Sequence, residues 1–252
     1  MRIAVASGKG GTGKTTLATS LALSLAGQQD VWYLDCDVEA PNGHLFLKPS
    51  LDQQTPAVIL IPQVEQERCT LCGKCVEVCP FHALAKIGQS ILVFPQLCHG
   101  CGSCTWNCPE QAITEIPHPI GILESGITPD GIHFARGLLT ISEPMPTPII
   151  RQLKRQRPAG PGAVTILDAP PGASCAVVET LRGADYVLLV TEPTPFGLHD
   201  LRQMLAIVQE MNIPAGIVIN RDGIGDDQAE KFLAQSRLPI WMRIPFETSI
   251  AT

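Results

Sequence analysis

Two groups of residues in this 252-residue chain have the types and the spacing that chemistry requires. The first lies near the start, where residues 8–15 read Gly-Lys-Gly-Gly-Thr-Gly-Lys-Thr. This is the Gly-x4-Gly-Lys-Thr pattern of a phosphate-binding loop. An apolar run at 3–6 precedes the loop and an amphipathic run at 17–25 follows it, so we expect a strand, a loop and a helix in that order. The sequence therefore predicts a phosphate site at the N-terminus of a helix.

Each residue type in the loop has an expected role. Glycines allow backbone N–H groups to turn toward an anion, and Lys14 is expected to reach the β- and γ-phosphates of a nucleotide. The hydroxyl group of Thr15 is expected to ligate Mg²⁺. We assign nucleotide contacts to the whole loop, which comprises Gly8, Lys9, Gly10, Gly11, Thr12, Gly13, Lys14, Thr15 and Thr16.

The second group consists of eight of the ten cysteines. The spacing Cys-x2-Cys-x2-Cys-x3-Cys, closed by proline, occurs twice with an offset of 29 residues. The first run contains Cys69, Cys72, Cys75 and Cys79, and the second contains Cys98, Cys101, Cys104 and Cys108. Ten cysteines in a chain without secretory features favour metal ligation over disulfides. Zinc and iron–sulfur clusters are both candidates, and two runs of four cysteines favour the clusters.

The repeated run resembles that of bacterial two-cluster ferredoxins, in which the fourth cysteine of each run ligates the other cluster. The resemblance implies an inserted, small α+β ferredoxin-like domain over residues 65–115. It also implies two [4Fe–4S] clusters, one on Cys69, Cys72, Cys75 and Cys108 and one on Cys98, Cys101, Cys104 and Cys79. His99, inside the second run, is interpreted as a neighbour of the cluster and not as a ligand.

The early lysine of the loop, Lys9, makes residues 9–16 resemble the deviant Walker A motif, Lys-Gly-Gly-x-Gly-Lys-Thr-Thr. That motif belongs to the MinD/ParA/Mrp ATPases, to which nitrogenase iron protein is related. The resemblance implies an ATPase whose hydrolysis is stimulated by a partner. It also implies a homodimer that forms on ATP binding, with Lys9 crossing the interface to the partner's nucleotide.

Acidic residues follow two predicted strands, at 31–34 and 164–167. Asp37 closes an Asp-Cys-Asp sequence after the first strand, and Asp168 opens Asp-Ala-Pro-Pro-Gly after the second. Carboxylates at such strand ends face the ligand side of an open α/β sheet, although turn or helix-capping aspartates are the alternative. The resemblance implies that Asp37 orients the attacking water and that Asp168 holds Mg²⁺ through a water. The same motif implies that Gly172 responds to the γ-phosphate. The predicted catalytic residues are Lys9, Lys14, Asp37 and Asp168.

Base recognition is expected at the far end of the chain. Asn220 and Arg221 follow a predicted strand at 215–219, and an asparagine offers both the donor and the acceptor that adenine requires. Pro245 follows the last predicted strand, at 239–244, and lines the base pocket in the resembled family.

Cys175 lies three residues after Gly172. In nitrogenase iron protein a cysteine near this position ligates a cluster at the dimer interface, so one hypothesis gives Cys175 a bridging role. The alternative is a buried helix cysteine that only packs. A Cys175→Ala variant with unchanged iron content would remove the bridging hypothesis.

The periodicity predicts a doubly wound, mostly parallel α/β sheet with ATP at its carboxyl edge. The predicted ATPase domain comprises residues 1–64 and 116–252. Strands are also expected at 57–61, 120–123, 132–135 and 187–190. Helices are expected at 149–156 and at 229–235, and a further helix is expected to end at about residue 211. Relatives continue for another helix after the last strand, whereas this sequence stops at Thr252.

Composition limits the partners. The net charge is −6 and no apolar run approaches 18 residues, so neither nucleic acid nor a membrane is expected. The chain begins directly with a strand, which predicts no signal peptide and a cytoplasmic location.

The leading hypothesis is an ATP-switched homodimer that passes electrons through two clusters to a redox partner. The alternatives are an Mrp-type carrier that delivers clusters to apo-iron–sulfur proteins, and a positioning ATPase with a structural cluster domain.

Overall fold

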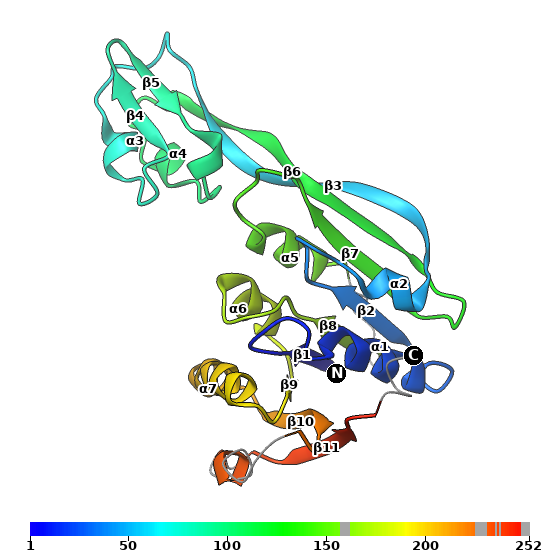
Figure 1. Cartoon of the computed structure of the whole chain (residues 1–252). Helices are drawn as coiled ribbons and strands as arrows, with labels where there is room; N and C mark the ends of the chain where they lie inside the picture. The colour runs from blue at the N-terminus through cyan, green and yellow to red at the C-terminus, as the bar shows by residue number, and fades with distance from the viewer. Residues whose placement is uncertain (157–161, 225–230, 235, 237, 248–252) are drawn as a thin grey trace.

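The computed structural model describes residues 1–156, 162–224, 231–234, 236 and 238–247. Within them, one large twisted sheet carries helices on both faces, and a long two-stranded arm holds a small outlying unit away from the body (Figure 1). The strand order in the large sheet is β11-β10-β9-β1-β8-β2-β7-β6-β3. In the part of the chain described, no helix is long and apolar enough to cross a membrane.

The strands from β11 to β7 in this order are parallel, as the sequence predicts. Its strands are β1 (Arg2–Ala6), β2 (Val31–Asp35), β7 (His133–Leu139), β8 (Val164–Asp168), β9 (Tyr186–Thr191), β10 (Ala215–Asp222) and β11 (Ile240–Pro245). Apart from the exposed edge strand β11, these strands are largely buried and apolar along most of their length, since helices lie on both faces of the sheet. The register places Asp35 directly beside Asp168, at the carboxyl ends of β2 and β8.

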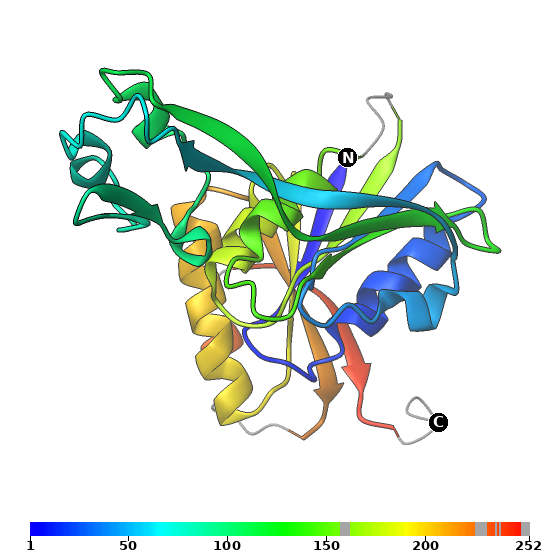
Figure 2. The same ribbon diagram turned by 90° about the horizontal axis from the view of Figure 1, so that it is seen from above.

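Helices cover the two faces of the sheet unequally. On one face, α1 (Lys14–Leu25) and α2 (Gly43–Leu47) pack over the stacked rings of Tyr33 and Phe134. On the other face lie α5 (Thr147–Leu153), α6 (Cys175–Leu181) and α7 (Pro195–Glu210), which Figure 2 shows on the same side of the sheet as one another. Residues 231–234 are helical, and the rest of the helix predicted at 229–235 falls outside the described residues.

The arm consists of β3 (Ser50–Val64) and β6 (Ile113–Ile127), which pair antiparallel from one end to the other. Residues 121–127 of β6 also pair with β7, whereas residues 113–119 pair with β3 alone in the described structure. Both strands are longer than the predicted segments at 57–61 and 120–123. Prolines and polar residues in both strands hide the strand pattern, because a half-exposed ribbon does not require a buried face.

The outlying unit at the end of the arm spans residues 65–112. It contains two related short helices, α3 (Lys74–Glu77) and α4 (Ser103–Trp106), each preceded by a left-handed glycine, Gly73 or Gly102. A two-stranded sheet of β4 (Leu84–Ile87) and β5 (Ser90–Val93) and the short 3₁₀ helix η1 (Pro95–Leu97) complete it. The predicted insert, 65–115, therefore differs at its end from the outlying unit, because residues 113–115 belong to β6.

Candidate functional site

The phosphate-binding loop connects β1 to α1, as its sequence predicts. Gly11 and Gly13 have positive φ angles of 77° and 86°, which only glycine adopts without strain. The loop lines a cavity together with Asp37, Asn42 and Pro171. In the described structure the N-terminus of α1 receives no side-chain cap, and the buried Thr12 hydroxyl has no partner. Free N–H groups and a hydroxyl in this position are suited to binding phosphate.

Lys14 and Asp168 meet at the base of the cavity. The Nζ atom of Lys14 lies 3.0 Å from Oδ1 of Asp168, and the Tyr33 hydroxyl donates to Oδ2 at 2.8 Å. Asp168 is completely buried, and among the described residues Lys14 and Tyr33 are the side chains that contact its carboxylate. Burial, followed by the neighbouring Asp168, raises the pKa of Tyr33 well above its usual value. Two predicted residues are therefore in direct contact, and Tyr33 is a third member that the motifs did not indicate.

The two aspartates after β2 differ in their surroundings. Asp37 lines the phosphate cavity, where burial raises its pKa and the Lys14 ammonium opposes that shift. The Asp35 carboxylate instead accepts from the N–H groups of Asp37, at 3.3 Å, and Gly43, at 2.8 Å. Burial and the charge of Asp168 raise the pKa of Asp35 to about 7. Sequence analysis gave Asp35 no role, yet it fixes the backbone that carries Asp37.

The raised pKa of Asp35 predicts a pH-dependent stability. Between about pH 4 and pH 7 the folded state retains a proton that the unfolded chain releases, so this carboxyl stabilises the fold below pH 4 and loses that contribution by pH 7. The loss is up to about 1.4 kcal/mol per pH unit. We expect the melting temperature of the nucleotide-free protein to fall by roughly 5 °C from pH 5 to pH 7 through this group. The Asp35→Asn variant should lack this fall, whereas the exposed Asp52→Asn control should keep it. Parallel pH profiles for wild type and Asp35→Asn would contradict the assignment.

Lys9 makes a contact that the motif did not indicate. Its Nζ lies 3.0 Å from Oε2 of Glu192, and Arg221 Nη1 lies 2.9 Å from Oε1 of the same carboxylate. The Glu192 side chain is only 6% exposed, and it joins the loop to the end of β10. Asn220 adds a second link, because its Nδ2 donates to the Thr12 carbonyl at 2.8 Å. Glu192 could have been found from its position at the end of β9, but not from a motif.

The residues predicted to contact the base lie together. Asn220, Arg221 and Pro245 line one cavity with Gly11 and Gly13 of the loop. Gly13 has no room for a side chain, since an added Cβ would lie 2.4 Å from Asn220 Nδ2. The two cavities thus meet at the phosphate-binding loop, one on the side of Asp37 and one on the side of Asn220.

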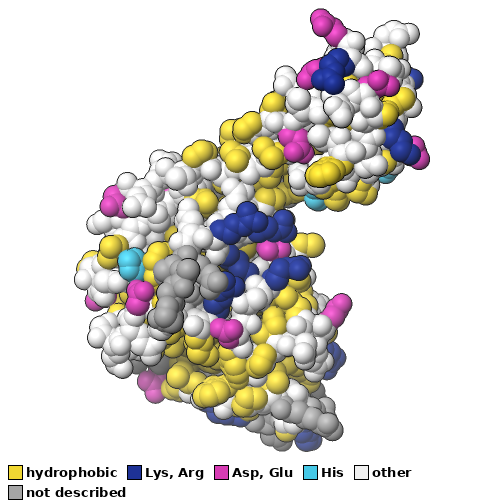
Figure 3. All heavy atoms as spheres, turned by 180° about the vertical axis from the view of Figure 1, so that it is seen from behind, with side chains coloured by type: hydrophobic (Ala, Val, Ile, Leu, Met, Phe, Trp, Pro, Cys, Tyr) yellow, Lys and Arg dark blue, Asp and Glu magenta, His cyan; other side chains and the backbone are white. Residues whose placement is uncertain are grey.

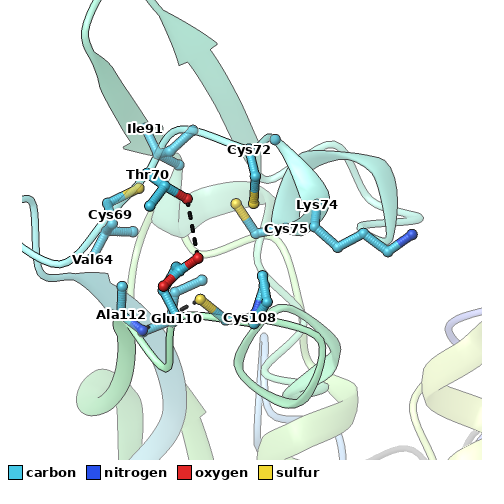
Figure 4. A pocket seen from close by; sticks show the side chains of 13 residues that line it. Val64, Cys69, Thr70, Cys72, Lys74, Cys75, Ile91, Cys108, Glu110 and Ala112 are labelled. Carbon is cyan, nitrogen blue, oxygen red and sulfur yellow. Dashed lines mark hydrogen bonds between the residues drawn. The ribbon is translucent and has the colours of Figure 1, made fainter.

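The cysteines assigned to the first cluster surround one hollow in the outlying unit. Cys69, Cys72 and Cys75 come from the first run and Cys108 comes from the end of the second, and Figure 4 shows their side chains around the hollow. Thr70 and Glu110 also line it and are 3.5 Å apart through their side-chain oxygens.

The cysteines assigned to the second cluster surround another hollow, and here too the set crosses between the runs. It is lined by Cys79, Cys98, Cys101 and Cys104. Phe81 and His99 stack at its edge with ring centroids 3.6 Å apart. These positions correspond to Glu110 and Thr70 of the first hollow by the 29-residue offset.

The donor groups around both hollows are of the kind that would hold an iron–sulfur cluster, with four cysteines at each hollow. Backbone N–H groups approach three of the sulfur atoms, with Ala83 to Cys79 at 3.3 Å, Gly100 to Cys98 at 3.4 Å and Ala112 to Cys108 at 3.3 Å. Such contacts stabilise thiolate charge. Among the described residues, no group of three or more His, Cys, Asp or Glu side chains converges closely enough for one metal ion.

The two remaining cysteines lie in the body. Cys36 is completely buried, and burial raises the pKa of its thiol. Cys175 is exposed at the first residue of α6, so the interpretation of a buried packing residue is wrong for it. Its bridging role stays a prediction.

Comparison with known proteins places the chain among nucleotide-binding proteins. The family profile described as "CobQ/CobB/MinD/ParA nucleotide binding domain" matches residues 3–252. An uncharacterized protein of Methanocaldococcus jannaschii is 36% identical over 90% of this chain and 80% of its own length. An iron–sulfur cluster carrier protein of Synechocystis is 25% identical over 98% of this chain and 61% of its own length. The septum site-determining protein MinD from Pyrococcus horikoshii, solved with Mg-ADP, has a TM-score of 0.57 at 17% identity, covering 99% of this chain and 83% of that one.

Fold and site together define a P-loop nucleotide-binding protein of the α/β class. The chain belongs to the CobQ/CobB/MinD/ParA nucleotide-binding family. The likeness to the MinD structure, at 17% identity, concerns the fold alone.

Proposed function

We propose that this protein couples an ATP-switched homodimer to electron transfer through two [4Fe–4S] clusters. The observation that carries the proposal is the pair of four-cysteine hollows, each drawing cysteines from both sequence runs. Such clusters accept and donate single electrons when they are bound. We assign nucleotide binding to residues 1–64 and 116–252 and the clusters to residues 65–115, on a single chain whose halves are joined by the arm.

The position of the arm supports coupling between the two halves. The segment that contains Asp37 continues through α2 to Leu47, and β3 begins at Ser50. A displacement of this segment on nucleotide binding is therefore transmitted directly into one strand of the arm. The same segment is also joined to the second strand of the arm. The Leu139 N–H of β7 donates to the Val38 carbonyl at 2.8 Å, and β7 pairs with β6.

The nucleotide half has the residues that an ATPase requires. In our assignment Lys14 binds the β- and γ-phosphates, Thr15 ligates Mg²⁺, and Asp168 holds Mg²⁺ through a water. Lys14 must then exchange its contact with Asp168 for the phosphates. We further assign Lys9 to the partner subunit's nucleotide. Its departure from Glu192 leaves that buried carboxylate paired with Arg221, so the exchange does not strand a charge.

An anaerobic redox titration followed by electron paramagnetic resonance tests the coupling. It is performed once with Mg-ADP and once with a non-hydrolysable ATP analogue. We expect the cluster potentials to shift by about 60 mV between the two states, which is ~1.4 kcal/mol of coupling per one-electron cluster. Identical titrations, together with reduction of an acceptor at equal rates with ATP, ADP and no nucleotide, would refute ATP gating.

One observation favours a second candidate, because a similar protein is described as an iron–sulfur cluster carrier. A carrier should transfer its iron to an apo-ferredoxin within minutes, whereas an electron-transfer protein should retain it. Against transfer, each hollow offers four cysteines, and outside residues 65–115 the sequence has no Cys-x-x-Cys that could bridge two subunits.

A further inference from the structure

The arm contains a discontinuity where it leaves the sheet. Ala57 pairs with Gly121 and Val58 pairs with Pro119, so Ile120 is an extra residue in β6 without a partner in β3. Such a β-bulge bends the ribbon and increases its twist. Going outward from the body, the pairing of β6 with β7 ends at Gly121, and the Thr140 N–H donates to the Ile120 carbonyl at 3.0 Å, so the bulge lies at the end of the part of β6 that the body supports (Figure 1).

Hydrogen bonding within the ribbon is also weak at this point. Pro117 and Pro119 lie opposite Leu60 and Val58, and a proline has no N–H to donate across the ladder. Gln152 of α5 contacts β3 at the same place. Its Nε2 donates to the Val58 carbonyl at 2.9 Å, and its Oε1 accepts from the Val58 N–H at 3.2 Å. One side chain thus bonds both polar groups of Val58, as a neighbouring strand would.

The helix that carries Gln152 is firmly joined to α6. Arg151 of α5 pairs with Glu179 of α6 at 3.1 Å, and the side chain of Glu179 is only 9% exposed. Lys154 Nζ donates to the carbonyls of Glu179, Thr180 and Arg182 at 2.6, 2.9 and 2.7 Å, and so caps the C-terminus of α6. Basic side chains gather beside the base of the arm in Figure 3. With Ile149, Ile150 and Leu153 fully buried as well, α5 and α6 are packed together as one unit.

This unit begins next to the nucleotide site. Cys175, the first residue of α6, follows Gly172 by three residues. The Gly172 N–H donates to the Ser7 carbonyl of the phosphate-binding loop at 3.1 Å, and Gly172 has a positive φ of 90°. Gly172 therefore lies where a change on nucleotide exchange would reach the start of α6 and, through the contacts between the helices, α5.

We propose that the arm bends at the bulge of residues 57–58 and 120, and that Gln152 is the positioning residue that sets its angle. The helices α5 and α6 transmit the nucleotide state of residues 168–172 to Gln152. The angle determines where the outlying unit, and any cluster in it, lies relative to the body. The inference deepens the proposed function and rests on it in assuming that nucleotide moves residues 168–172.

Hydrogen–deuterium exchange of the intact protein tests this device, since the Val58 amide reports its bond to Gln152 directly. We compare Mg-ADP with Mg and a non-hydrolysable ATP analogue in the wild type, Gln152→Ala and Gln152→Glu. The glutamate still accepts from the Val58 N–H but cannot donate to the Val58 carbonyl. Gln203→Ala, which removes an exposed glutamine from α7, is the matched control.

We expect the two nucleotides to give different exchange over residues 58–64 and 113–119 in the wild type and the control. In Gln152→Ala the difference should disappear while nucleotide affinity is unchanged, and Val58 should exchange about fivefold faster, the effect of losing one net hydrogen bond. In Gln152→Glu the difference should shrink. The proposal would be overturned if exchange in the wild-type arm were the same with both nucleotides. It would also be overturned if the Gln152 variants kept the full difference in exchange between the two nucleotides.

The same samples separate this inference from the proposed function. An arm that responds to nucleotide in a protein without iron, or with ungated cluster reduction, would refute electron-transfer coupling and leave the hinge intact. Gated reduction with an unresponsive arm would refute the hinge and leave the proposed function intact.

Discussion

Replacing Lys14 by alanine is expected to lower ATP turnover by about 10²–10³-fold, since the lysine is the main charge that the site offers to the β- and γ-phosphates. The structure adds a second effect. Asp168 is completely buried and would keep only the Tyr33 hydroxyl as a partner. An uncompensated buried carboxylate costs about 3–5 kcal/mol, so we also expect a lower melting temperature.

A second substitution separates these two effects. Lys14→Arg keeps a cation beside Asp168 but replaces a compact ammonium by a broad planar group. It should restore the melting temperature without restoring turnover. Lys48→Ala, at an exposed lysine outside both nucleotide cavities, is the control for general effects of removing a charge. Turnover within twofold of wild type in Lys14→Ala would contradict the site assignment.

Substituting Cys108 by serine is expected to remove the same cluster as substituting Cys72, although the two residues belong to different sequence runs. Each single variant should lower the iron content from about eight to about four atoms per chain. The physical reason is the arrangement of the first hollow, where Cys108 lies with Cys69, Cys72 and Cys75. Iron analysis and the electron paramagnetic resonance spectrum of the reduced protein report the result.

Paired substitutions provide the matched comparison. Cys72→Ser with Cys108→Ser should retain about four iron atoms, because both ligands serve one cluster. Cys72→Ser with Cys79→Ser should lose nearly all iron, because Cys79 lines the other hollow. The reverse pattern would show that each run holds its own cluster. About two zinc atoms and no iron in the wild type would refute the clusters altogether.

The sequence alone was enough to predict the local features of this protein. The phosphate-binding loop connects a strand and a helix where the motif requires; Asp37 follows β2 as predicted, and Asp168 is the last residue of β8. Such features are encoded within about ten residues, so spacing along the chain fixes spacing in space. The cysteines that line each hollow are those that the resemblance to two-cluster ferredoxins groups together, because an internal duplication relates distant residues, and their ligation of clusters stays a prediction.

The tertiary structure decided the features that depend on how separate elements meet. No motif indicates that Glu192 holds both Lys9 and Arg221, since these residues come together only when the loop, β9 and β10 align in the sheet. The high pKa of Asp35 likewise results from its burial in the folded sheet and from its register beside Asp168, a residue 133 positions away.

The length of the arm and the contact of Gln152 with Val58 were also beyond the sequence. Strand β3 is held by backbone pairing with β6 and by a side chain from α5, so its own polar residues and prolines conceal it. The spacing of apolar residues in a segment indicates which side chains that segment buries. It does not indicate which strands pair through backbone hydrogen bonds, because every residue except proline carries the same backbone donor and acceptor.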